Sequence, residues 1–233
     1  MERFGFVGLP NAGKSSLYNA LAGGGALAAP YAFATTDPNE GVARVPDSRL
    51  TLLGEMSNSQ KIVSATIQFT DIGGLVEGAA KGEGLGNRFL AGIREVDAIV
   101  FVLRAFSDDD VPGPTDPVEH LRIVEVELAL ADLETTQKQL SKIEKVAKSD
   151  KSIGQTLDSL KHASEQLDQG IPIYKSDLIS SEREMLSDFF LLTDKPVLAV
   201  VNMGEDQVER TNQILEPVIA ELPDQEVIGM CVQ

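Results

Sequence analysis

Residues 8–15 read GLPNAGKS, and this stretch restricts the possible folds of the chain more than any other. Its spacing is a glycine, four residues, a second glycine, a lysine and a serine. The apolar run RFGFV precedes it, and Leu17 and Leu21 follow it at helical spacing. Glycines in a loop between a buried strand and a helix let backbone N–H groups surround an anion. The stretch therefore predicts a phosphate-binding loop rather than a plain glycine-rich turn.

The residue types in this loop indicate which atoms would contact a nucleotide. The Lys14 side chain would bridge the outer phosphates, and the Ser15 hydroxyl would bind Mg²⁺. The N–H groups of the loop and of the first helical turn would point at the phosphates. The predicted nucleotide contacts in this segment are Asn11, Ala12, Gly13, Lys14, Ser15 and Ser16.

Further apolar segments predict the sheet to which this loop belongs. The run AIVFVL at 98–103 is continuous rather than alternating, and KPVLAVVN at 195–202 and EVIGMCV at 226–232 are of the same type. Continuous apolar strands separated by helices are typical of a mostly parallel sheet with helices on both faces. GVARVP at 41–46 and SATIQFTD at 64–71 predict a further pair of strands. We therefore expect an α/β fold of the Ras-like P-loop NTPase class.

The composition changes between residues 117 and 170, where strand signals are missing and Glu, Lys, Gln and Leu dominate. Apolar residues follow a three-four spacing in two runs, which KSDKSIG at 148–154 separates. This pattern predicts a helical hairpin of the coiled-coil type, with ordinary amphipathic surface helices as the alternative. We expect the nucleotide-binding domain in two parts, 1–116 and 193–233, with a helical insertion at 117–192.

Two other segments predict how the site would respond to a third phosphate. FTDIGGL ends a strand with Asp71 and continues to Gly74. Asp71 would hold Mg²⁺ through water, and the Gly74 N–H would contact the terminal phosphate. Thr35 and Thr36 lie in a loop before the second strand, and one of them would reach Mg²⁺, as in GTPase switches. The spacing alone does not choose between the threonines, and a plain threonine-rich loop is the alternative.

The segment NMGE at 202–205 stands where a guanine-reading protein has Asn-Lys-x-Asp. Glu205 adds a methylene and would not keep the paired hydrogen bonds that an aspartate makes with guanine. Met203 would offer an apolar surface to the face of a purine. We therefore expect a weakened guanine preference, with tolerance of adenine or a preference for it. The alternative is that Asn202 and Glu205 only cap the following helix.

Charge and composition exclude several classes of protein. The formal net charge is −16, which does not fit non-specific binding of nucleic acid, and we expect no sequence-specific DNA binding. The longest apolar run has six residues, which is too short to cross a bilayer. Residues 1–10 do not resemble a signal peptide, and Cys231 is the single cysteine, so no internal disulfide can form. We expect a cytoplasmic protein without membrane partners.

Five stretches together resemble the YchF/Obg-like ATPase family over essentially the whole chain: GLPNAGKSS, YAFATTDPN, FTDIGGLVEGAAKGEGLGNRFL, VELALADLET and LLTDKPVLAVVNMGED. The resemblance implies a nucleotide-binding domain with a helical hairpin, ATP used at least as readily as GTP, and association with the ribosome. It selects Thr35 as the magnesium-sensing threonine, and it places Cys231 where the family's last base-contacting loop begins.

The chain departs from the family in three places. Family members continue with a ubiquitin-like TGS domain, whereas this sequence stops at Gln233, which would cut the last base-contacting loop. Members often have a histidine in the loop after the fourth strand, and SDDDVPGPTDP has none. We expect His120 and His162, the two histidines, on the surface of the helical segment. The switch-loop proline is missing from YAFAT, which we regard as a minor change.

The residue after Gly74 bears on the rate of hydrolysis. Ras-type switches use a glutamine there to orient the attacking water, and Leu75 has no hydrogen-bonding group. We therefore expect slow intrinsic hydrolysis, with Lys14, Thr35 and Gly74 as the catalytic contacts. Asn11 favours K⁺ as a second cofactor beside Mg²⁺, because related switches without the glutamine bind K⁺ through an asparagine there; a purely structural Asn11 is the alternative. Two functions stay open, a regulatory ATPase or GTPase and a nucleotide-bound scaffold whose hairpin binds a partner.

Overall fold

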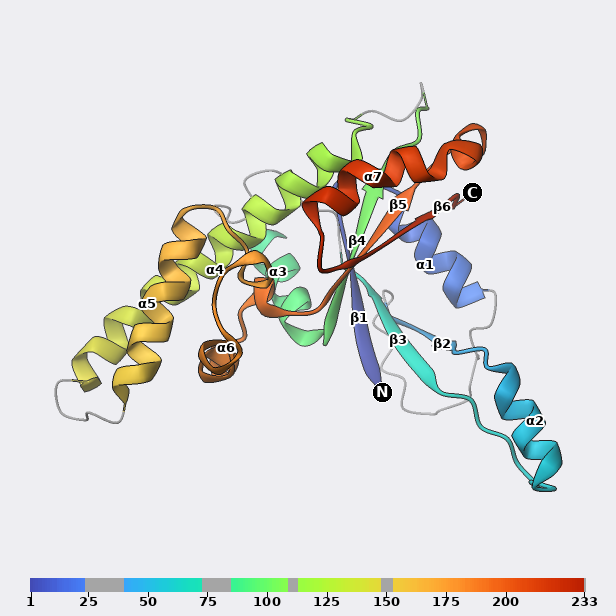
Figure 1. The fold of residues 1–233 in the computed structure, drawn as a ribbon, viewed down its shortest axis with the longest axis horizontal. Coiled ribbons are helices and arrows are strands. Elements are labelled where there is room, and N and C mark those ends of the chain that lie inside the picture. Colours follow the sequence, from blue (N-terminus) through green and yellow to red (C-terminus); the bar gives the residue numbers. More distant parts are fainter. Residues whose placement is uncertain (24–39, 73–84, 109–112, 148–152, 233) are drawn as a thin grey trace.

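The computed structural model describes residues 1–23, 40–72, 85–108, 113–147 and 153–232. Its centre is a six-stranded sheet in the order β2-β3-β1-β4-β5-β6 (Figure 1). Strand β2 is antiparallel to β3, and every other neighbouring pair is parallel. The predicted mostly parallel sheet is therefore confirmed. The strands are β1 (Glu2–Val7), β2 (Glu40–Arg44), β3 (Thr66–Asp71), β4 (Ala98–Arg104), β5 (Val197–Asn202) and β6 (Glu226–Met230).

Helices connect the strands and surround the sheet (Figure 1). None of the described helices is long and apolar enough to cross a membrane. The α-helices are α1 (Lys14–Gly23), α2 (Ser48–Met56), α3 (Leu85–Glu95), α4 (Pro117–Ala147), α5 (Gly154–Asp168), α6 (Ser180–Leu186) and α7 (Thr211–Glu221). Short 3₁₀ helices are η3 (Ile173–Lys175), η4 (Ser187–Phe189), η5 (Leu192–Asp194) and η6 (Glu205–Arg210).

Strand β4 shows why its sequence is continuously apolar. Ile99, Phe101 and Leu103 belong to a core cluster on the side of α3, α4 and α7. Val100 and Val102 belong to a second cluster on the side of α1. Successive side chains of a strand point to opposite faces, and here both faces are buried. The pattern that predicted helices on both faces is therefore confirmed.

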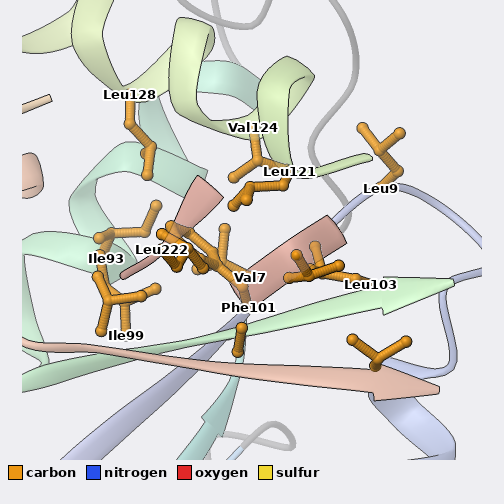
Figure 2. Close-up of a cluster of buried hydrophobic side chains, with 14 of the residues drawn as sticks. Val7, Leu9, Ile93, Ile99, Phe101, Leu103, Leu121, Val124, Leu128 and Leu222 are labelled. Atoms are coloured by element: carbon orange, nitrogen blue, oxygen red, sulfur yellow. The ribbon is translucent and has the colours of Figure 1, made fainter. Parts of the chain in front are cut away.

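The larger cluster lies where α4 crosses the sheet. Figure 2 shows Leu121, Val124 and Leu128 of α4 directed toward the strands that carry Val7 and Phe101. All five of these side chains are fully buried. Full burial of such a side chain contributes about 1.5–3 kcal/mol, so the first half of α4 is part of the main core.

The distal half of α4 has different neighbours. It packs beside α5, and Leu140 and Ile143 of α4 contact a third cluster that contains Leu160, Ala163 and Leu167 of α5. The predicted pair of packed helices is therefore present (Figure 1). Helix α4 belongs both to this pair and to the covering of the sheet, and the bounds 117–192 for a separate insertion stay a prediction.

Helix α2 lies between β2 and β3 and projects from the rest of the domain (Figure 1), and no pattern predicted it. Asp47 begins the helix, because its Oδ1 accepts a hydrogen bond from the Arg49 N–H at 3.0 Å. Leu52, Leu53 and Met56 are exposed. A helix without a buried apolar face gives no period for sequence analysis to detect.

The surface position expected for His120 is wrong. Its side chain is 1 % exposed, and Nε2 lies 2.7 Å from the Pro114 carbonyl oxygen. Burial lowers the pKa of His120, since the charged form is poorly solvated there. His162 is partly exposed and lies between the carboxylates of Asp177 and Glu182. His120 is buried, whereas His162 is partly exposed, because the first turns of α4 pack on the sheet.

Asp132 joins α4 to the segment that leads into β5. Its carboxylate accepts hydrogen bonds from the Leu192 N–H at 2.8 Å, the Thr193 N–H at 2.7 Å and the Thr193 hydroxyl at 2.7 Å. The side chain is 0 % exposed. Burial raises the pKa of Asp132 to about 6, although the three donors act in the opposite direction.

We expect Asp132→Ala to lower the free energy of unfolding by about 2–4 kcal/mol, because two buried N–H groups and a hydroxyl lose their acceptor. Urea denaturation followed by circular dichroism measures this change. Glu144→Ala, on the exposed surface of the same helix, is the control and should change stability by less than about 0.5 kcal/mol. Equal effects of the two substitutions would contradict the role given to Asp132.

Candidate functional site

The loop between β1 and α1 takes a shape that its glycines allow. A Cβ on Gly8 would lie 2.4 Å from the Val102 carbonyl oxygen, so the loop backbone packs directly against β4. Gly13 has a φ of 98°, and a Cβ there would lie 2.2 Å from Nδ2 of Asn202. Asn11 has a φ of 62°, in the left-handed region that asparagine adopts more readily than most residues. Both glycines of the motif are therefore required by close approach to neighbouring strands.

Lys14 begins α1, and its side chain folds over the loop. Its Nζ donates hydrogen bonds to the carbonyl oxygens of Gly8 at 3.1 Å and Leu9 at 2.9 Å. The residue is 6 % exposed, and burial lowers the pKa of Lys14 while the charge of Asp71 raises it. Backbone carbonyls carry only partial negative charge, so a buried ammonium group held by them would favour an anion that enters the loop.

The predicted magnesium residues Ser15 and Asp71 lie together. The Ser15 hydroxyl donates a hydrogen bond to Oδ2 of Asp71 at 2.7 Å, across 56 residues of sequence. Neighbouring β1 and β3 bring them together, because Asp71 is paired with Phe6 at the end of the parallel ladder. The described residues contain no cluster of three His, Cys, Asp or Glu side chains that would hold a metal by itself. Two oxygen ligands fit Mg²⁺, which takes its other ligands from phosphates and water.

The other predicted phosphate contacts fall into two groups. Ala12 is a buried residue of the loop, and Ser16 is exposed on the first turn of α1. Thr35 and Gly74 lie outside the described residues, as do Thr36 and Leu75. The roles of Thr35 in magnesium binding and of Gly74 at the terminal phosphate therefore stay predictions.

Asn202 connects the phosphate loop to the end of the sheet. Its Nδ2 donates to the Ala12 carbonyl oxygen at 3.1 Å, and its Oδ1 accepts from the Val232 N–H at 3.1 Å. The side chain is 2 % exposed. In the alternative, Asn202 would cap the following helix, but neither of these two bonds goes to that helix. The amide instead fixes the phosphate loop, β5 and the segment after β6 relative to one another.

Met203, expected to offer an apolar surface to a purine, is buried in this structure. Met203 is 3 % exposed and belongs to the core cluster that also contains Ala199 and Val201. Its methyl group packs against Gly229 of β6. The alternation of β5 sends Met203 into the core and Asn202 toward the phosphate loop, and this alternation is readable from the sequence. Contact of a base with Met203 stays a prediction.

Glu205 and Cys231 lie beside this region in different settings. Glu205 is the exposed first residue of η6, and Cys231 is a half-exposed free thiol directly after β6. The Met203 N–H donates to the Met230 carbonyl oxygen at 2.8 Å, so the loops that carry the two residues are adjacent. Their contacts with a base stay predictions.

Sequence patterns missed Gln207, which contacts two segments of the site. Its Oε1 accepts from the Gly204 N–H at 2.9 Å, and its Nε2 donates to the Ala105 carbonyl oxygen at 3.0 Å. No motif contains a glutamine at this place. The contact with Ala105 spans 102 residues, so only the tertiary structure reveals it.

Comparison with known proteins shows which family the chain resembles. The profile of the family described as 50S ribosome-binding GTPase matches residues 3–147. The Ribosome-binding ATPase YchF of Bacillus subtilis is 42 % identical over 98 % of this chain and 65 % of its own length. The protein of that name from Escherichia coli O157:H7 is 40 % identical over 97 % of this chain and 64 % of its own length. The chain thus spans a little less than two thirds of these relatives.

A solved structure gives the same result for the fold. The Schizosaccharomyces pombe YchF GTPase is 34 % identical, with a TM-score of 0.82, over 99 % of this chain and 65 % of that one. The resemblance to YchF/Obg-like proteins and the predicted P-loop fold are therefore confirmed. The chain belongs to the 50S ribosome-binding GTPase family, and its sequence and fold are similar to those of YchF proteins over nearly its whole length.

Proposed function

We propose that the chain is a ribosome-associated P-loop nucleoside triphosphatase that hydrolyses ATP, and also GTP, to the diphosphate. It would act as a nucleotide-dependent regulatory switch in translation or the stress response. One observation carries the proposal: two side-chain hydrogen bonds, Ser15 to Asp71 and Asn202 to Ala12, join the predicted phosphate, magnesium and base segments at one edge of the sheet. The printed name of the relatives, ribosome-binding ATPase, supports the nucleotide and the partner.

In this proposal the site residues would supply binding and charge stabilisation for the reaction. Lys14 would exchange its two carbonyl acceptors for phosphate oxygens, and the loop N–H groups would hold the rest of the phosphate chain. Ser15 and Asp71 would hold Mg²⁺, which neutralises phosphate charge when bound. Thr35 and Gly74 would report the third phosphate. The expected low intrinsic rate follows from Leu75, which cannot orient water.

The proposed setting is the cytoplasm, and the proposed partner is the ribosome or one of its subunits. No membrane and no specific DNA sequence is among the partners that we propose. The net charge of −16 is consistent with this choice, because a protein that binds the phosphate backbone of DNA needs a basic surface.

A second function, a scaffold that binds through its helices, has its own supporting observation. Lys138, Lys142 and Lys145 are exposed on the distal half of α4, opposite the side on which Leu140 and Ile143 pack against α5. At about 1.5 Å of rise per residue they stand about 6 and 4.5 Å apart along the helix axis. A basic row of this kind on a strongly acidic protein fits the phosphates of ribosomal RNA.

Base choice tests the first function. By calorimetric titration with Mg²⁺, we expect a non-hydrolysable ATP analogue to bind more tightly than the GTP analogue. Glu205→Asp should improve binding of the GTP analogue by about tenfold, because the shorter carboxylate reaches two donors of guanine. Glu209→Asp, exposed in the same helix η6, is the control and should change neither affinity. A strong GTP preference of the unchanged chain would contradict the assignment of NMGE.

Cation dependence tests the role of Asn11. We expect steady-state ATP hydrolysis to be about tenfold faster in KCl than in NaCl, because K⁺ would stabilise charge that develops on the phosphates. Asn11→Ala should remove this difference, whereas Asn19→Ala on the exposed side of α1 should keep it. Equal rates in the two salts would exclude the potassium hypothesis.

Salt dependence of ribosome binding tests the scaffold function. Replacing Lys138, Lys142 and Lys145 by Gln should reduce affinity for 50S subunits in co-sedimentation, with or without nucleotide. The slope of log affinity against log salt should fall by about 2–3, since each lost phosphate contact removes roughly 0.7–0.9. Replacing the exposed Arg44, Lys61 and Arg210 by Gln removes equal charge elsewhere and should have little effect. Equal losses in both variants would mean that only net charge matters.

A further inference from the structure

The side chain of Gln207 makes two hydrogen bonds in opposite directions. It accepts from the Gly204 N–H through Oε1 and donates to the Ala105 carbonyl oxygen through Nε2. A side-chain amide offers a donor and an acceptor on one planar group, which neither a carboxylate nor an ammonium does. The bond to Gly204 alone would only cap η6. The bond to Ala105 reaches the segment directly after β4 and therefore does more than cap a helix.

These contacts close a ring of hydrogen bonds around the start of the base segment. The Ala105 N–H donates to the Asn202 carbonyl oxygen at 2.8 Å, and the Ala105 carbonyl oxygen accepts from Gln207. Gln207 in turn accepts from Gly204, two residues after Asn202. The segment 202–204 is thus tied twice to the exit of β4. Neighbouring Met203 is fixed by its bond to Met230 and by burial in the core.

The ring determines where Glu205 stands. Glu205 directly follows Gly204, and its side chain is exposed. A Cβ on Gly204 would lie 2.6 Å from Oδ1 of Asp206, so the segment turns tightly at this residue. A residue that recognises a base by hydrogen bonds to its edge needs a backbone that keeps one position, because hydrogen bonds weaken steeply with distance and angle. In the described structure, Gln207 supplies that restraint from the side of β4.

We propose that Gln207 is a positioning residue for base selection, which fixes segment 202–205 so that Glu205 and the Met203 backbone favour adenine over guanine. The proposal rests on the proposed function, since it requires that NMGE contacts the base. Gln207 itself does not contact the nucleotide. Its removal therefore changes the ratio of ATP to GTP affinity and leaves the phosphate loop intact.

Calorimetric titration of three probes into the full chain tests this role. The probes are non-hydrolysable ATP and GTP analogues with Mg²⁺, and Mg²⁺-pyrophosphate, which reports the phosphate loop alone. Gln207→Ala should weaken the ATP analogue about tenfold and bring the two nucleotide affinities close to each other, with pyrophosphate binding unchanged. Gln207→Glu keeps the acceptor for Gly204 and loses the donor to Ala105, so its affinity ratio should lie between those of the unchanged chain and Gln207→Ala.

Gln213→Ala is the matched control. Gln213 is exposed on α7 and lines the same surface cavity of about 270 Å³ as Gln207 and Ala105, but it lies outside the base segment. It should behave as the unchanged chain with all three probes. An unchanged ATP to GTP ratio in both Gln207 variants would overturn the proposal, as would equal weakening of all three probes together with a lower melting temperature. If the unchanged chain bound pyrophosphate but neither nucleotide, the proposed function and this inference would both fail. If the unchanged chain preferred ATP and the Gln207 substitutions did not change that preference, this inference alone would be overturned.

Discussion

Five neighbouring strands run parallel, and helices cover the sheet on both sides, so the carboxyl ends of β1, β3, β4, β5 and β6 meet at one edge. The polar groups of the candidate site lie there because both faces are filled by apolar side chains. Lys14 begins α1 directly after the loop that follows β1, Asp71 ends β3 and Asn202 ends β5. The sheet brings them to one edge, because β3 lies beside β1 and β5 lies one strand further along, beyond β4. The burial of the sheet is thus also what assembles the site.

The first half of α4 packs on the sheet by its apolar face, and buried polar contacts join it to the short helices η3 and η5. Glu125 accepts a hydrogen bond from the Tyr174 hydroxyl at 2.6 Å and pairs with Lys175. Burial together with the nearby Glu125 charge raises the pKa of Tyr174 well above its usual range, so the phenol stays a donor. Asp132 makes the corresponding connection about two helical turns further along. Removal of one partner from such a contact leaves the other unpaired in the interior. These contacts therefore specify the position of the first half of α4.

Sequence reasoning succeeded where one physical rule dominates. The phosphate loop, the continuous apolar strand at 98–103 and the pairing of 41–46 with 64–71 each follow from local pattern, and the structure contains all three. It failed where contacts distant in sequence decide the outcome. His120 is buried because α4 packs on the sheet, and Gln207 gains its role from Ala105, so neither is readable from neighbours in the chain. Met203 is a different case, because its burial in the core continues the alternation of β5, while its contact with a base stays a prediction.

The charges around the phosphate loop form one connected unit. Burial lowers the pKa of Lys14, and Asp71 opposes that shift, while Asp71 also accepts the Ser15 hydroxyl. In the proposed function, a phosphate chain that enters the loop would replace the carbonyl acceptors of Lys14 with full negative charge and would favour its ammonium form. A cation beside Ser15 would replace the hydrogen bond between Ser15 and Asp71 and would draw the charge of Asp71 away from Lys14, for which the phosphates would compensate. Binding of the anion and binding of the cation would therefore be coupled through these three side chains, and nucleotide affinity would be the difference between the new contacts and the internal ones that they displace.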